Sequence, residues 1–483
     1  MKPRRKMTAK QYAFILILAT AITAFGSQAG ADVSDVAQLA MTVETLQKQI
    51  QELRATVYEQ GEKIKVMERH EPVVRVGPSA VGEHIDTSEF DERLQEKIGT
   101  SDAWLKDLDF GGDFRLRWEP SDRTDGPGKA NDRNRFRYRL RFGWEKAFRP
   151  DTKVGFGLAS QAANTEAAST NTSLDDSFTT KPISIEKAYA DYQPDWAARG
   201  PIEKVRMAGG KFENPFEEGS SAIVWDRDVR PEGFFERVEL QVIDTEAFDV
   251  HLYGLAGQLI LEEEAGSGDA ELWAWQVGLK PAVDVGWVKP LALKSVFSYY
   301  NYSDFGNLTS DGGTNVTSGN PSAIVTNAAG GFSAEDFDIV EIYNEAEFTP
   351  FSERFPIKTF FDWATNVANG ALSEAAGDLN HAWALGFKVG KAKTKGGMEF
   401  GYEYRYVDPN AVVGQFADSD FGFANKRGSV FSAKYNVTDD LELGLTGFFT
   451  NNITADSSAS GVVAANRTDE ETRLFFTDLV WKF

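Results

Sequence analysis

The chain of 483 residues contains no cysteine, which excludes thiol catalysis, disulfide frameworks and cysteine-ligated metals. It has four histidines, at positions 70, 84, 251 and 381, too few for a histidine-rich metal site, and we expect neither a metal nor another cofactor. The chain also has no excess of basic residues, because it contains 73 acidic and 51 basic side chains and its formal net charge is −22. A nucleic-acid partner is thereby excluded, since binding phosphates needs a basic face.

Long apolar runs are absent except near the N-terminus. Residues 1–31 combine a positively charged start, an apolar stretch from Tyr12 to Phe25, and the small residues Ala29-Gly30-Ala31. That order predicts a secretory signal peptide that is cleaved before Asp32. A membrane-anchoring helix is the alternative, but the stretch is shorter than the roughly 20 residues that span a bilayer core.

Residues 32–71 carry a heptad pattern. Apolar residues recur at spacings of three and four, from Val36 and Leu39 to Ile64 and Met67, with the polar Gln60 as a weak point. Such a seam predicts a coiled coil, and β-branched residues at a with mostly Leu at d favour two strands. An amphipathic helix that folds back on its own domain is the alternative. Residues 72–107 contain prolines, glycines and many charges, and we expect a linker there.

From residue 108 to the end, the apolar residues recur with period two. In the segment from Arg135 to Phe142, every odd residue is arginine and every even residue is apolar or aromatic. About 16 such stretches follow one another, and short connections alternate with long polar ones. The pattern predicts an all-β fold for residues 108–483: a transmembrane antiparallel β-barrel of about 16 strands, preceded by the short α-helical coiled coil. Short turns would be periplasmic and long loops extracellular.

The last stretch ends on aromatic residues. Phe475, Thr477, Leu479, Trp481 and the terminal Phe483 share one face of the expected strand. This ending resembles the signal by which the barrel-assembly machinery recognises bacterial outer-membrane barrels, with Trp481 and Phe483 as its residues. We therefore expect the chain in the bacterial outer membrane, in contact with its lipid, with the coiled coil in the periplasm.

If the aromatic faces meet lipid, the opposite faces line the lumen. Basic pore-lining candidates on the first two strands are Arg115, Arg117, Arg135, Arg137, Arg139 and Arg141. Acidic candidates on other strands are Glu239, Glu341, Glu345, Glu347, Glu399 and Glu403. Opposed charges would set up a field across the lumen and control ion preference. The alternative is a salt-bridge network that fills a closed barrel, although a barrel of about 16 strands encloses an aqueous channel unless a loop closes it.

One long loop, from Glu213 to Glu232, is a candidate constriction. Its acidic residues Glu217, Glu218, Asp226 and Asp228 would face the arginines if the loop folded inward. An ordinary solvated loop is the alternative.

Several motifs resemble a known family. They are Gly111-Gly112-Asp113-Phe114-Arg115-Leu116-Arg117, the run from Asn134 to Arg141, Ala188-Tyr189-Ala190-Asp191-Tyr192, Gly209-Gly210-Lys211-Phe212 with Glu213-Asn214-Pro215-Phe216, and the run from Trp225 to Gly233. They resemble bacterial outer-membrane porins, and more narrowly the family of putative porins, along essentially the whole mature chain. The resemblance implies a homotrimer and no catalytic residues. The chain is less specifically similar to alginate-export barrels.

We therefore expect a water-filled channel for passive diffusion of small hydrophilic solutes, whose arginine-lined wall favours anions or oriented polar solutes. Alternatives are a selective channel for an acidic oligosaccharide, or a structural barrel that tethers the cell wall or sheathes a cytochrome. We expect no enzymatic activity, because no nucleophile motif lies beside either barrel histidine, His251 or His381.

Overall fold

A computed structural model describes residues 108–123, 132–161, 167–263, 269–284, 291–303, 320, 337–350, 352–368, 379–453 and 471–483. The expected signal peptide, coiled coil and linker lie outside these residues. Within the described ranges, no helix has the length and apolar character needed to cross a membrane.

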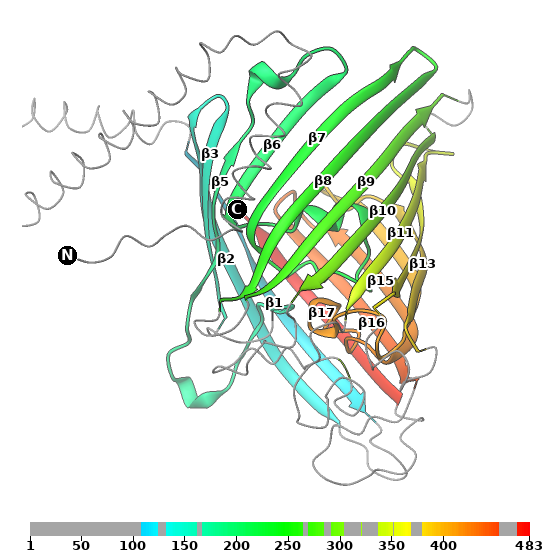
Figure 1. Ribbon diagram of the computed structural model, residues 1–483. Coiled ribbons are helices and arrows are strands. Elements are labelled where there is room, and N and C mark those ends of the chain that lie inside the picture. Colours follow the sequence, from blue (N-terminus) through cyan, green and yellow to red (C-terminus); the bar gives the residue numbers. More distant parts are fainter. Residues whose placement is uncertain are drawn as a thin grey trace, which may run out of the picture. The chain divides into compact units, whose positions relative to one another are not determined.

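The described residues form antiparallel strands (Figure 1). Their bounds are β1 Leu108–Arg123, β2 Arg133–Arg149, β3 Thr152–Ala159, β4 Thr172–Ser173, β5 Ser184–Tyr192, β6 Ile202–Lys211, β7 Glu232–Asp244, β8 Phe248–Glu262, β9 Ala270–Val283, β10 Leu291–Ser303, β11 Asp338–Phe348, β12 Ile357–Asn366, β13 His381–Gly390, β14 Met398–Val407, β15 Lys426–Asn436, β16 Leu441–Asn452 and β17 Glu471–Lys482.

The sheet closes on itself. Each strand pairs with the next, and β1 completes the circle by pairing with β17, where Phe114 stands opposite Trp481. The two-residue β4 continues the line of β3 by pairing with β2 beyond the end of β3, at Arg137↔Ser173. The described residues therefore form a closed antiparallel barrel of 16 strands, as the sequence predicted.

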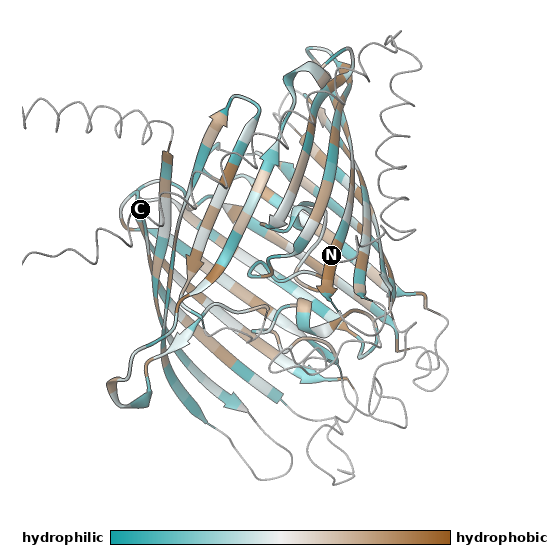
Figure 2. Ribbon diagram, turned by 60° about the vertical axis from the view of Figure 1, so that its left-hand side comes forward, coloured by the Kyte–Doolittle hydropathy of each residue, from teal (hydrophilic) through white to brown (hydrophobic). Residues whose placement is uncertain are grey.

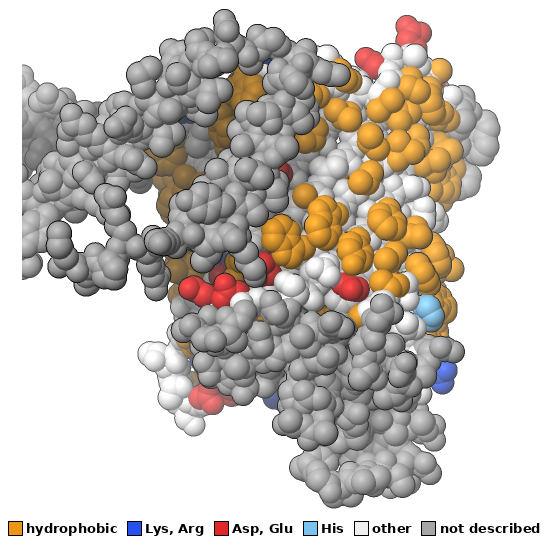
Figure 3. Space-filling view, viewed as in Figure 1, with side chains coloured by type: hydrophobic (Ala, Val, Ile, Leu, Met, Phe, Trp, Pro, Cys, Tyr) orange, Lys and Arg blue, Asp and Glu red, His pale blue; other side chains and the backbone are white. Residues whose placement is uncertain are grey.

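The period-two pattern separates an apolar outside from a polar inside, and the strand colours alternate accordingly in Figure 2. Outward residues such as Phe136, Phe297 and Phe431 are 50 to 57% exposed, because they face the surroundings of the barrel. Figure 3 shows the resulting apolar surface over β8 to β13. An outer surface this rich in large apolar side chains is suited to lipid and not to water.

The hydrophobic core lies inside the barrel, where two long loops pack together. We call residues 212–231, between β6 and β7, the first inner loop, and residues 408–425, between β14 and β15, the second inner loop. Their backbones are joined by Asp226 N donating to Phe416 O at 2.6 Å and by Asp418 N donating to Ala222 O at 3.1 Å.

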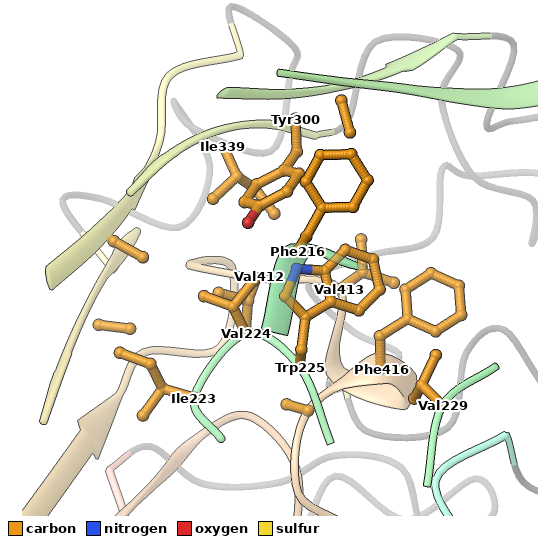
Figure 4. Packing of buried hydrophobic residues seen from close by; sticks show 14 of the residues in the cluster. Phe216, Ile223, Val224, Trp225, Val229, Tyr300, Ile339, Val412, Val413 and Phe416 are labelled. Carbon is orange, nitrogen blue, oxygen red and sulfur yellow. The ribbon is translucent and has the colours of Figure 1, made fainter. Parts of the chain in front are cut away.

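Aromatic rings fill the space between the inner loops and the wall (Figure 4). The ring of Trp225 stacks on Phe416 at 5.7 Å between centroids and meets Tyr300 of β10 edge-on at 5.6 Å. Phe216 and Tyr300 are completely buried, and Trp225 is 1% exposed. The inner loops therefore occupy part of the lumen, and inward residues from strands between β6 and β17 complete this core.

Candidate functional site

The inner faces of β1 and β2 form an arginine wall, defined by the six arginines that the sequence singled out. Arg115 stands directly opposite Arg139, and Arg117 opposite Arg137, in the register of the two strands. Like charges directly opposite each other destabilise a sheet unless other groups compensate them. The position of carboxylates around the wall therefore determines whether this repulsion is compensated.

Five of the six arginines are ion-paired. Arg117 contacts Asp478 of β17 at 2.8 Å and Asp420 of the second inner loop at 3.2 Å. Arg135 and Arg137 share Glu119. Further pairs are Arg139–Asp113 at 2.6 Å, Arg141–Glu186 at 2.9 Å and Arg141–Asp228 at 2.9 Å.

The wall is therefore close to charge balance. Six arginines meet six carboxylates, namely Asp113, Glu119, Glu186, Asp228, Asp420 and Asp478. Arg115 is the exception, because its side chain donates to the amide oxygen of Asn171 and no described carboxylate lies within ion-pair distance of it. Arg115 thus carries the least compensated charge of the wall.

The carboxylates of the inner loops, which do not span the membrane, respond differently to this environment. Burial alone would raise the pKa of Asp228, but Arg141, Arg139 and Arg115 hold it well below its ordinary value. Burial, together with the nearby charges of Asp228 and Asp418, raises the pKa of Asp226 well above its ordinary value. The first inner loop therefore presents one firmly charged carboxylate to the arginine wall.

Two cavities lie along the arginine wall. One of about 290 Å³ contacts Asp109 and residues 111–113 of β1 and residues 141–145 of β2, and the other of about 370 Å³ contacts Glu119 and Arg135. Arg115, Arg117, Arg137 and Arg139 lie between the two cavities along the strands. Open space in this part of the lumen is thus interrupted by the most charged stretch of the wall.

The first cavity exists because its wall lacks side chains. Gly111, Gly143 and Gly157 are direct neighbours across β1, β2 and β3, and all three line the cavity. A Cβ at Gly143 would lie 2.3 Å from Phe156 O, so only glycine fits at the centre of this row. The row of glycines leaves open space along the strands next to the arginines.

On the other side, the first inner loop is anchored by buried carboxyl groups. Ser220 Oγ donates to Glu341 Oε1 at 2.5 Å, and Ser221 N donates to Asp362 Oδ2 at 2.8 Å. Tyr300 OH also donates to Glu341, at 2.9 Å. Glu341, expected to line the pore, is instead completely buried beneath this loop.

The other acidic strand candidates are dispersed. Glu345 contacts Lys358 at 2.9 Å and Lys294 at 3.5 Å, Glu239 contacts Arg237 at 2.7 Å, and Glu403 pairs with Arg405. Glu347 contacts Lys391 at 3.0 Å, and Glu399 stands opposite Lys434. These carboxylates do not gather into one cluster facing the arginine wall.

The acidic candidates of the first inner loop divide into two groups. Asp228 reaches the arginine wall, and Asp226 Oδ1 accepts from the backbone N of Asp228 at 2.7 Å. Glu218 contacts Arg237 at 2.6 Å, and Glu217 contacts Arg227 at 3.3 Å. The loop is thus folded inward, but of its four acidic candidates only Asp228 contacts the arginine wall.

Sequence reasoning missed the second inner loop. Asp420 contacts Arg117, and Asp418 contacts Arg405 at 2.6 Å. A signal was present, because Val412, Val413, Phe416 and Phe421 are unusually apolar for a solvated connection. Asn171, which contacts Arg115, was also missed. The polar residues around it in the sequence form no pattern that would predict this contact.

The C-terminal strand closes the barrel. Gly112 N donates to Phe483 O at 2.8 Å, and Phe483 N donates to Gly112 O at 3.1 Å. The rings of Trp481 and Phe483 are 39% and 65% exposed on the outside. Their recognition by an assembly machinery stays a prediction.

A closed antiparallel barrel of 16 strands with an apolar outside is the architecture of transmembrane β-barrels of the bacterial outer membrane. A family model described as "Putative porin" matches residues 124–354, which confirms the resemblance seen in the sequence.

Solved structures of other barrels are similar to the chain. OprB of Pseudomonas putida at high pH is 11% identical, with a TM-score of 0.44, covering 80% of this chain and 97% of that chain. Salmonella typhi OmpF in complex with daunomycin is 11% identical, with a TM-score of 0.41, covering 78% and 97%. OmpT of Vibrio cholerae in its trimer form is 12% identical, with a TM-score of 0.39, covering 78% and 99%. No curated protein matches the chain.

Proposed function

We propose that the protein is an outer-membrane channel for passive diffusion of small hydrophilic solutes. The observation that carries this proposal is the division of the lumen. The inner loops reach the arginine wall through Asp228 and Asp420, and cavities remain between the loops and β1 and β2 on either side of these contacts. A barrel of this strand number is wide enough for an aqueous passage, which the inner loops narrow.

The charges of this passage would orient the solutes that cross it. Arginines of the wall and carboxylates of both inner loops produce a field across the passage, from the strands towards the loops. Because most arginines are compensated, we expect oriented polar solutes to pass, with a modest preference for anions that depends on Arg115.

We also propose how the channel is placed and assembled. The signal peptide would be removed, the barrel-assembly machinery would insert the barrel, and residues 32–71 would form a periplasmic coiled coil. The assembly would be a homotrimer held by the coiled coil and by the barrel wall. Deleting residues 32–71 separates two roles, because lost trimers indicate assembly, whereas intact trimers with a loosened envelope indicate tethering.

Conductance of the purified protein in planar bilayers tests the channel proposal. Under a salt gradient we expect steady channels with a reversal potential of modest anion preference, and Arg115→Gln should abolish or invert that preference. Arg149→Gln is the matched control, because Arg149 is exposed at the end of β2 and outside the wall. Absence of conductance from a folded, inserted barrel would overturn the proposal, and an unchanged reversal potential in Arg115→Gln would remove Arg115 from the passage.

A further inference from the structure

The cavity beside the glycine row has the size and the enclosure of a binding site. We call this cavity of about 290 Å³ the glycine recess. Its walls come from β1, β2, β3 and β5, of which β2, β3 and β5 lie side by side (Figure 1), and from both ends of the first inner loop through Glu213 and Arg230. Sites for small molecules begin at about 300 Å³. The recess therefore suits a solute about the size of a single sugar ring.

A tyrosine ring lies flat against the wall of the recess. Tyr189 of β5 stands directly opposite Gly155 of β3, and a Cβ at Gly155 would lie 2.4 Å from atoms of the Tyr189 ring. The ring therefore crosses over Gly155, and its hydroxyl donates to Glu145 Oε1 of β2 at 2.6 Å. One face of the ring is turned to the strand backbone. Because Tyr189 lines the recess, the other face is available to a solute.

Most charged groups around the recess are paired. Five carboxylates and three cations line it, and every one of these cations has a carboxylate partner. The pairs are Glu186 with Arg141 at 2.9 Å and with Arg230 at 3.4 Å, Glu213 with Lys187 at 2.8 Å, and Asp113 with Arg139 of the arginine wall at 2.6 Å. Such pairs offer both donors and acceptors to a polar solute without an excess of positive charge.

Two carboxylates of the recess have no cation. Asp109 of β1 and Glu145 of β2 stand directly opposite each other in the register of the strands, and both line the recess. Within the described part of the chain, no cation lies within ion-pair distance of either. The recess is therefore negative overall. It repels anions, and its carboxylate oxygens accept hydrogen bonds from hydroxyl groups.

We propose that the glycine recess binds a neutral sugar in its pyranose form, with the sugar ring stacked on Tyr189 and the hydroxyl groups bonded to the surrounding carboxylates and ion pairs. One face of a pyranose carries C–H groups that pack against an aromatic ring, and its edge carries hydroxyls that both donate and accept. An acidic sugar fits less well, because its carboxylate would approach Asp109 and Glu145. This inference rests on the proposed channel and names a class of solute that the passage retains.

Single-channel current in planar bilayers tests the site on the full chain. Glucose added to the salt solution should reduce the current in a saturable manner, beyond the effect of viscosity. Sorbitol has a hydroxyl on every carbon but no ring, and it should give the viscosity effect alone. Glucuronate should compete with glucose only at several-fold higher concentration. Saturable binding of sorbitol as strong as that of glucose, or equal competition by glucuronate, would overturn the proposal.

A tyrosine variant locates the effect in the recess. Tyr189→Ala should raise the half-saturating glucose concentration about tenfold, because it removes the ring on which the sugar stacks. Tyr435→Ala is the matched control, since Tyr435 is 40% exposed on the outside of β15, and it should leave that concentration unchanged. An unchanged half-saturating concentration in Tyr189→Ala would show that the sugar does not bind in the recess.

A charge variant tests the site without altering the ring. Asp109→Asn, at an exposed side chain, should bring the competition by glucuronate closer to that of glucose, because one repelling charge is lost. An unchanged preference for glucose in this variant would contradict the assigned role of the carboxylates, whether or not Tyr189→Ala folds. Conductance in salt alone separates the two proposals. Steady channels without a saturable glucose effect contradict the site alone, whereas a folded barrel that does not conduct contradicts the channel itself.

Discussion

At the residue scale, charges on the inner loops change the net charge beside the arginine wall. Asp420 contacts Arg117 at 3.2 Å. Burial raises the pKa of Asp420 to about 6, with Arg117 opposing the shift and Asp418 adding to it. Asp420 is therefore ionised at pH 8 and neutral at pH 5, and the wall gains one net positive charge as the pH falls. The bound proton stabilises the fold at low pH, and this contribution is lost as the pH rises through about 6.

We predict that the anion preference of the channel increases as the pH is lowered from 8 to 5, with a midpoint near 6. Reversal potentials measured at a series of pH values check this. Asp420→Asn should show the low-pH preference at every pH, because its side chain cannot ionise. A midpoint that persists in Asp420→Asn would assign the titration to another group.

At the element scale, the strands follow from local pattern and the inner loops do not. A run such as Arg135 to Phe142 specifies both faces of a strand by itself, so strand number and closure were predictable from the sequence. The carboxylates of the first inner loop left an inward fold and a solvated loop as alternatives, and Trp225, which packs between Phe416 and Tyr300, was not identified as an anchor. The second inner loop was not predicted, because its apolar residues are explained by a partner distant in sequence: Phe416 stacks on Trp225 of the first inner loop.

The packing between the inner loops should therefore control the size of the passage. Trp225→Ala removes the ring that touches both Phe416 and Tyr300, and such truncations in packed cores cost about 3 to 5 kcal/mol. We predict larger and noisier single-channel conductance, together with a lower unfolding temperature. Phe297→Ala, at an exposed outer position, should change neither conductance nor noise. Quiet channels of unchanged size in Trp225→Ala would show that the inner loops do not limit the passage.

At the scale of the whole molecule, closure joins the first strand to the last residue of the chain. This contact has the longest sequence separation in the barrel, and it involves two backbone hydrogen bonds between Gly112 and Phe483. Pairing of such distant segments is entropically costly before it forms, so closure is expected to be a late step of folding. The aromatic ending predicted an outer-membrane barrel, but only the structure shows that the backbone of Phe483 itself pairs with Gly112 of β1.

Deletion of Phe483 should therefore impair barrel formation more than its single side chain suggests. We predict several-fold less heat-modifiable, folded protein in the outer membrane, because the last hydrogen bonds of the β1–β17 seam are lost along with the exposed ring. Phe483→Ala separates the two causes, since it keeps the backbone pairing and removes the ring. Equal losses in both variants would indicate that the ring is what matters, through recognition during insertion. A loss confined to the deletion would assign the effect to backbone closure, and undiminished folding of the deletion variant would contradict the prediction.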